Sequence, residues 1–188
     1  MHVTADRTLM IHESRPAPDL RLALKPEGAP AGLLDGAWWP RSRNLLRELP
    51  ALTDVLDPLW GRITRISVNP ERWPVVPRMV PVTGHSVKVG WFRAEQDPHK
   101  LLLVSYRVGR WDLLVIPPEA SAATAARLMA AANGSGDLRT ASALIAEDDA
   151  AQSLVGGRRL REQWETEGGA VPAAAASRAV PTARAGKA

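Results

Sequence analysis

Hydrophobic and polar residues alternate in several short stretches, which predicts a fold built largely of strands. The alternation covers 20–24, 66–68 and 87–91. A hairpin is expected over 105–118, where Gly109 suits a turn with positive φ and Pro117-Pro118 ends the second strand. Because both faces of that second strand carry apolar residues, we expect it in the middle of the sheet.

Helical periodicity is strong at one place near the start and weaker near the end. Leucines at 45, 49, 52, 56 and 59 form one stripe, with Ser42 as a candidate N-cap and Pro50 as a predicted kink or break. Two further helices are expected over 121–133 and 140–154. The pair Gly156-Gly157 predicts a break after them.

These elements predict an α+β fold. We expect an antiparallel sheet or small open β-barrel of five to seven strands, with one early helix and C-terminal helices covering it. The segment 75–82 contains two prolines and is therefore predicted to be an edge strand. The single domain is expected to span 19–155. Its flanks are predicted to be a flexible arm (1–18), a short helix (156–167) and a disordered Ala/Pro/Arg tail (168–188).

The net charge and the absence of cysteine bear on the possible binding partners and on the cellular compartment of the protein. The net charge is +4, but residues 151–188 hold six basic and three acidic residues, so the first 150 residues carry only one net positive charge. The absence of cysteine excludes disulfides and thiolate chemistry and is compatible with a reducing cytoplasm. The first residues show no secretory pattern and no stretch is long and apolar enough for a membrane span, so we predict a cytoplasmic protein.

No strong catalytic motif is present, and no cofactor is predicted. The chain has no glycine-rich phosphate loop, no GxSxG and no HExxH. His85 and His99 fall in predicted turns with Asp97 nearby, which makes a metal site of two histidines and one carboxylate conceivable. Turn histidines are more often solvated, so no metal is predicted. Asp112 in the central strand needs a partner, for which Arg107, Arg110 and Arg65 are candidates.

Seven tryptophans and their neighbouring arginines form the candidate binding surface. Arginine can stack on indole and bind phosphate or carboxylate. The alternative is that the indoles fill the core while the arginine side chains lie across it. The candidate residues are Trp38, Trp39, Arg41, Arg43, Asn69, Arg72, Trp73, Arg107, Arg110 and Asp112.

An ordered series of segments resembles a family of small actinobacterial proteins known only as a domain of unknown function. The resemblance covers residues 20–133 and rests on GLLDGAWWPRS, RISVNPERWP, VGWF, EQDPH, SYRVGRWDLLVIPP and ARLMAAAN. It implies one domain in this region and fits the arginine-, alanine- and proline-rich composition. It implies no activity, cofactor or catalytic residue.

Three functions follow from these observations. The leading hypothesis is a non-enzymatic binding or regulatory module that acts through a protein partner, with no role at a membrane. The alternative is single-stranded nucleic-acid binding through the arginine and tryptophan surface. A metal-dependent enzyme using His85, His99 and Asp97 is the third. The sequence does not fix the oligomeric state.

Overall fold

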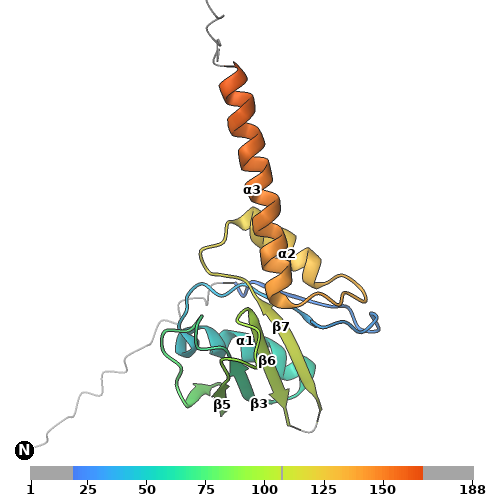
Figure 1. The fold of residues 1–188 in the computed structure, drawn as a ribbon. Coiled ribbons are helices and arrows are strands. Elements are labelled where there is room, and N and C mark those ends of the chain that lie inside the picture. The colour runs from blue at the N-terminus through green and yellow to red at the C-terminus, as the bar shows by residue number, and fades with distance from the viewer. Residues whose placement is uncertain (1–18, 107, 167–188) are drawn as a thin grey trace, which may run out of the picture. The chain divides into compact units, whose positions relative to one another are not determined.

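The computed structural model describes residues 19–106 and 108–166 (Figure 1). The predicted arm over 1–18, the tail over 168–188 and the candidate residue Arg107 lie outside the described residues. The chain divides into two compact units, residues 1–150 and residues 151–188. The sheet and both hydrophobic cores belong to the first unit.

Seven strands form one sheet in the order β1-β2-β7-β6-β3-β5-β4. Their bounds are Leu22–Leu24 (β1), Gly36–Trp38 (β2), Ile63–Val68 (β3), Met79–Val82 (β4), His85–Trp91 (β5), Lys100–Ser105 (β6) and Arg110–Val115 (β7). The predicted hairpin is β6 and β7, and β7 is an inner strand as expected, because β2 and β6 pair with its two sides. The proline-containing strand β4 lies at an edge, which confirms that prediction.

The sheet is mixed and open, so the prediction of a purely antiparallel sheet or barrel was only partly right. Strands β2 and β7 pair in parallel, and so do β3 and β5. The β3–β5 pair is parallel because residues 69–84 cross over between them and β4 forms a hairpin with β5. Alternation within a strand reports which face is buried but not the direction of its neighbour.

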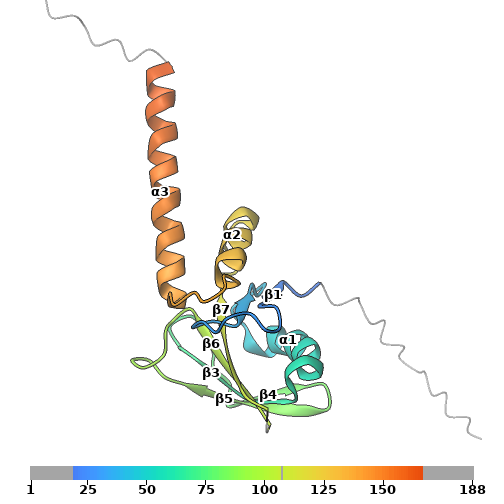
Figure 2. The ribbon, with the colours of Figure 1, turned by 90° about the vertical axis from the view of Figure 1, so that its right-hand side faces the viewer.

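Helix α1 (Leu45–Trp60) covers one face of the sheet (Figure 2). Its leucine stripe is buried at 45, 49, 52 and 56, while Leu59 is exposed. The N-cap is Asn44, whose Oδ1 accepts the amide of Leu46 at 3.0 Å, and not Ser42. Pro50 lies inside the helix without breaking it, and nearby the Thr53 hydroxyl donates to the Leu49 carbonyl at 3.1 Å.

Helices α2 (Ala122–Ala132) and α3 (Ala141–Thr166) follow the sheet. Ser121 caps α2 as predicted, and α2 packs on the other face of β2 and β7 together with Ala141 and Leu144. The two helices predicted over 140–154 and 156–167 are instead one. Gly156 and Gly157 lie inside α3 because two glycines weaken a helix without ending it.

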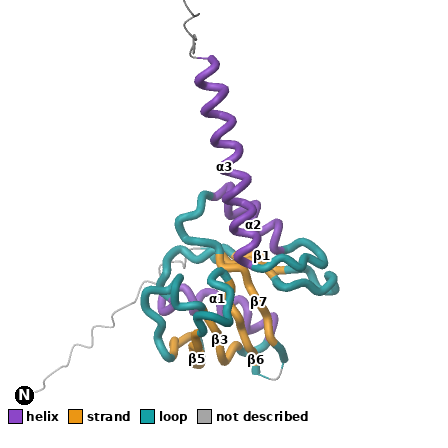
Figure 3. The backbone as a smooth tube through the Cα atoms, viewed as in Figure 1, coloured by secondary structure: helices purple, strands orange, loops and turns teal. Residues whose placement is uncertain are grey.

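The turn of the β6–β7 hairpin differs from the prediction. Gly109 does not adopt positive φ. The turn is closed instead by the Ser105 amide, which donates to the Gly109 carbonyl at 3.0 Å. Trp111 at the start of β7 stacks on Trp60 with ring centroids 4.7 Å apart. Figure 3 shows the strands of the sheet and the irregular loops that join them.

Candidate functional site

The loop between β2 and α1 begins at two adjacent tryptophans, which pack in different hydrophobic cores. Trp38 is fully buried in the core under α1 and stacks on Trp73, with centroids 6.0 Å apart. Trp39 is half-buried and packs against the second core. Trp38 and Trp73 are therefore core residues and not an exposed recognition surface.

Trp39 lines a pocket of about 300 Å³ beside α1, which we call the loop pocket. Arg21 lies over the Trp39 ring, with its guanidinium carbon 3.5 Å from the centroid. Arg41 and Arg47 also line this pocket. Trp39 thus contributes to a concave site that contains three arginines.

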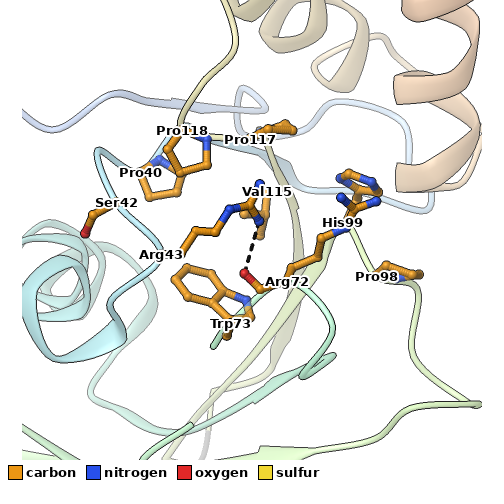
Figure 4. A pocket seen from close by; sticks show the side chains of 10 residues that line it. All are labelled: Pro40, Ser42, Arg43, Arg72, Trp73, Pro98, His99, Val115, Pro117 and Pro118. Atoms are coloured by element: carbon orange, nitrogen blue, oxygen red, sulfur yellow. Dashed lines mark hydrogen bonds between the residues drawn. The ribbon is translucent and has the colours of Figure 1, made fainter. Parts of the chain in front are cut away.

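A second, smaller pocket also takes part of its lining from this loop, through Pro40, Ser42 and Arg43 (Figure 4). Its cavity volume is only about 10 Å³. Arg43 donates to the Arg72 carbonyl at 3.0 Å and pairs with Glu119. In Figure 4 the Arg72 side chain extends toward the ring of His99. Three of the predicted candidate residues, Arg43, Arg72 and Trp73, line this pocket. Its volume is enough for only a single water molecule.

His99 in this small pocket is held in its neutral form. Burial lowers the pKa of His99 below its usual value, and the positive charge of Arg72 lowers it further. The charge of Asp97 opposes both effects but does not outweigh them. A neutral imidazole is therefore part of the folded state.

The two histidines of the conceivable metal site do not come together. His85 lies beside Ile63 at the start of β3, where its Nε2 is 2.8 Å from the Ile63 carbonyl. His99 precedes β6, whose first residues pair near the opposite end of β3. Among the residues that the structure describes, no group of three or more His, Cys, Asp or Glu side chains could hold a metal.

Asp97 has a structural role at the start of α3. Its carboxylate accepts the Ser142 amide at 2.9 Å, the Ser142 hydroxyl at 2.6 Å and the His99 amide at 2.8 Å. Burial alone would raise the pKa of Asp97, but the hydrogen bonds from Ser142 and His99 outweigh it and the pKa is lowered. The Asp97 carboxylate is therefore occupied by hydrogen bonds at the N-terminus of α3.

Asp112 and Arg110 lie on the face of the sheet opposite α1. Arg110 Nη2 contacts Asp112 Oδ2 at 3.1 Å, and Lys100 Nζ lies 3.5 Å from the other carboxylate oxygen. Arg110 is thus one of the partners predicted for Asp112, and Lys100 is a second that was not foreseen. The Asp112 amide donates to Asp35 Oδ2 at 2.8 Å.

Polar and apolar residues of β3, β5, β6 and β7 form what we call the open face. Its members are Arg65, Ser67, Lys88, Gly90, Lys100, Leu102, Val104, Arg110 and Asp112. The second core, which covers β2 and β7, contains no residue of β3, β5 or β6. A hollow of about 450 Å³ lies on the open face, and its lining includes Arg65, Phe92, Glu95, Leu102, Val104 and Arg110.

Three cations lie in one row across the open face. The register pairs Lys88 with Arg65, Arg65 with Val104 and Val104 with Arg110. Lys88 and Arg65 are exposed and directly opposite each other, and neither side chain makes a hydrogen bond or ion pair with a described residue. Like charges at opposite positions repel.

Asn69, another candidate, is buried and has only internal partners. Its Nδ2 donates to the carbonyls of Arg93 at 3.0 Å and Gln96 at 2.9 Å. Gln96 is buried too, and its side chain bonds Ser67 and the Lys100 carbonyl. These two amides fix the loop after β5 and are not available to a ligand.

The chain belongs to the DUF5994 family. The model of this family of unknown function matches residues 21–132, which confirms the predicted resemblance. No curated protein and no solved structure matches the chain. An actinobacterial origin stays a prediction, because the match to DUF5994 carries no organism. In the described part of the chain, no helix is long and apolar enough to cross a membrane.

Sequence reasoning missed several residues that line these sites. Arg21, Arg47 and Lys88 were not among the candidates, and Arg65 was considered only as a partner for Asp112. The alternation around Lys88 did place its side chain on the other face of the strand from the buried Val87 and Val89. Lys88 matters because Arg65 lies directly opposite it on β3. The sequence does not reveal that β3 and β5 are paired.

Proposed function

We propose that this chain is a non-enzymatic binding module that holds an acidic segment of a protein partner on the open face. The observation that carries the proposal is the pair Arg65 and Lys88, two exposed cations directly opposite each other without an acidic partner among the described residues. Such a pair opposes folding of the free protein and is relieved when a carboxylate binds between the two charges.

The layout of the open face fits a segment that contains both acidic and apolar residues. Neighbouring strands lie about 4.8 Å apart, so the row from Lys88 to Arg110 spans about 14 Å. Val104 lies within this row, and Leu102 lies in the next row beside Ser67. Acidic side chains of the partner would face Lys88 and Arg65, while apolar ones would cover Leu102 and Val104.

Single-stranded nucleic acid fits this surface less well. Sequence-tolerant binding of single strands needs aromatic faces on which successive bases stack. Trp38 and Trp73 are buried, and the Trp39 ring is covered by Arg21. Among the residues that line the hollow, Phe92 is the one aromatic side chain.

The proposal is tested with defined probes and charge reversals. Fluorescence anisotropy would measure binding of a labelled peptide of alternating Glu and Leu and of a labelled thymidine oligonucleotide. We expect the peptide to bind more tightly at physiological salt, and Arg65→Glu to weaken peptide binding about tenfold or more. The matched control is Arg158→Glu, which reverses an exposed arginine of α3 outside the open face.

Two results would contradict the proposal. Equal weakening by Arg65→Glu and Arg158→Glu would mean that only net charge matters. Tighter binding of the oligonucleotide, with affinity falling steeply as salt rises, would favour the nucleic-acid alternative. The lack of cysteine is compatible with a reducing cytoplasm, where we place this interaction.

A further inference from the structure

The loop pocket is a second concave site, formed by different residues from those of the open face. Arg21 of the segment before β1, Trp38 and Trp39 of β2 and its loop, and Arg47 of α1 contribute to its wall. Its volume of about 300 Å³ is at the lower end of the size of pockets that hold small molecules. The proposed function on the open face does not use it.

Arg21 is fixed in a geometry that leaves donors for a ligand. Its Nε donates to the Trp39 carbonyl at 3.0 Å and its Nη2 donates to the Pro40 carbonyl at 2.6 Å. The guanidinium carbon also lies over the Trp39 ring, 3.5 Å from its centroid. Because a guanidinium has five N–H donors, three remain after these two bonds. An arginine held in this way loses little entropy when it binds an anion.

Cations outnumber carboxylates in the lining of the pocket, with Arg21, Arg41 and Arg47 against Asp19 and Glu48. Burial lowers the pKa of Arg21, and the neighbouring charge of Arg41 lowers it further. The opposing carboxylate of Glu48 already accepts the Ser42 hydroxyl at 2.7 Å and the Arg41 amide at 3.0 Å. Arg47 is exposed and its side chain has no hydrogen bond or ion pair among the described residues.

Two tryptophans that line the pocket have indole N–H groups without acceptors. Nε1 of Trp38 and Nε1 of Trp39 are both buried without a hydrogen-bond partner in the described part of the chain. Trp38 is fully buried, and a buried donor without an acceptor costs about 1–3 kcal/mol. The three arginines that line the pocket outnumber its two carboxylates, Asp19 and Glu48, so a ligand with negative charge would balance the lining.

We propose that the loop pocket binds the oxyanion group, a carboxylate or a phosphate, of a small organic molecule. The remaining donors of Arg21 would bind the oxyanion, with Arg41 and Arg47 supplying charge at the rim. The apolar part of the ligand would lie against Leu20 and Ala51, which also line the pocket. A small anion held there would add to stability, because it binds only the folded chain.

Isothermal titration calorimetry of the full chain with succinate and with inorganic phosphate tests the site. We expect one of the two probes to bind in a one-to-one ratio, and the probe that binds identifies the source of the oxyanion. Arg47→Glu is expected to weaken that binding about three- to tenfold, since it replaces a rim cation by an anion. Arg158→Glu reverses another exposed arginine, one that does not line the pocket, and should leave binding unchanged.

Arg21→Lys gives a second readout that does not depend on the rim. Lysine keeps the positive charge but loses the fork that bonds two carbonyls, so we expect binding to fall more than in Arg47→Glu. A thermal melt of each variant shows whether it is folded before titration. Absence of heat with both probes, or equal weakening by Arg47→Glu and Arg158→Glu, would overturn the inference.

Discussion

His99 links the stability of the domain to pH through one buried side chain. The pKa of His99 is lowered in the folded state by burial and by the charge of Arg72. The unfolded chain therefore binds a proton at this residue at a higher pH than the folded chain does. The contribution of neutral His99 to the free energy of unfolding is therefore fully present above about pH 6.5. It is lost as the pH falls from about 6.5 toward the pKa of His99 in the folded state.

We therefore predict that His99→Gln reduces the loss of stability in mildly acidic solution. Urea unfolding at neutral pH and about one to two units lower would measure the free energy of unfolding in each case. The wild-type chain should lose more stability than the variant across this interval. Asp97 does not obscure the comparison, because its pKa is lowered and its effect falls below about pH 3.9. Equal slopes for both proteins would contradict the prediction.

For single residues, the sequence predicts that a charged side chain requires a partner better than it predicts which residue that partner is. That Asp112 requires a cation followed from its place in an apolar strand, and Arg110, two residues away, is one of its partners. Lys100 and Asp35 reach Asp112 from other strands and loops, so local reasoning could not find them. Arg43 likewise pairs with Glu119, which lies 76 residues later.

Helix α3 shows how two glycines can lie inside an element without ending it. Neither Gly156 nor Gly157 has another atom within 4 Å of the position of an added Cβ, and neither has positive φ. Alanine costs about 1 kcal/mol less than glycine in a helix interior. We predict that Gly156→Ala and Gly157→Ala each increase the helical signal in far-UV circular dichroism.

Gly84 provides a matched control for this prediction. An added Cβ would also meet nothing within 4 Å there, but the φ of Gly84 is +77°. Gly84→Ala should therefore destabilise the β4–β5 turn through backbone strain alone. If the Gly156 and Gly157 variants lowered the helical signal, the continuity of α3 across these residues would be in error.

At the level of elements, periodicity located most strands and the first two helices, but not the order of the strands. The alternation in 87–91 and in 66–68 was sufficient to define β5 and part of β3. Their parallel pairing depends on the crossover through β4, which no local pattern encodes. The open face follows from this pairing, so the row of Lys88, Arg65 and Arg110 could not be predicted before the fold was known.

At the scale of the whole molecule, the two proposed sites are formed by different charged residues, although the domain as a whole is nearly neutral. Residues 1–150 carry one net positive charge, so neither site arises from a generally basic surface. The open face combines cations with aliphatic residues, whereas the loop pocket combines cations with indoles. If both proposals hold, a protein segment and a small anion would be recognised by separate means.

The proposed role of the open face predicts opposite effects on stability and on binding. In the free protein Lys88 and Arg65 repel each other across neighbouring strands. Lys88→Glu would turn this repulsion into an ion pair and should raise the free energy of unfolding by about 0.5–1 kcal/mol. The same change removes a cation from the row and should weaken binding of the Glu/Leu peptide.

A double-mutant cycle separates this effect from a general effect of charge. Arg65→Glu alone should also raise stability, while Lys88→Glu combined with Arg65→Glu restores a like-charged pair and should return stability close to that of the wild type. Peptide binding should fall in each single variant and be lowest in the double variant. Chemical denaturation and fluorescence anisotropy on the same four proteins measure both quantities. Single variants that are less stable than the wild type would contradict the repulsion on which the proposed function rests.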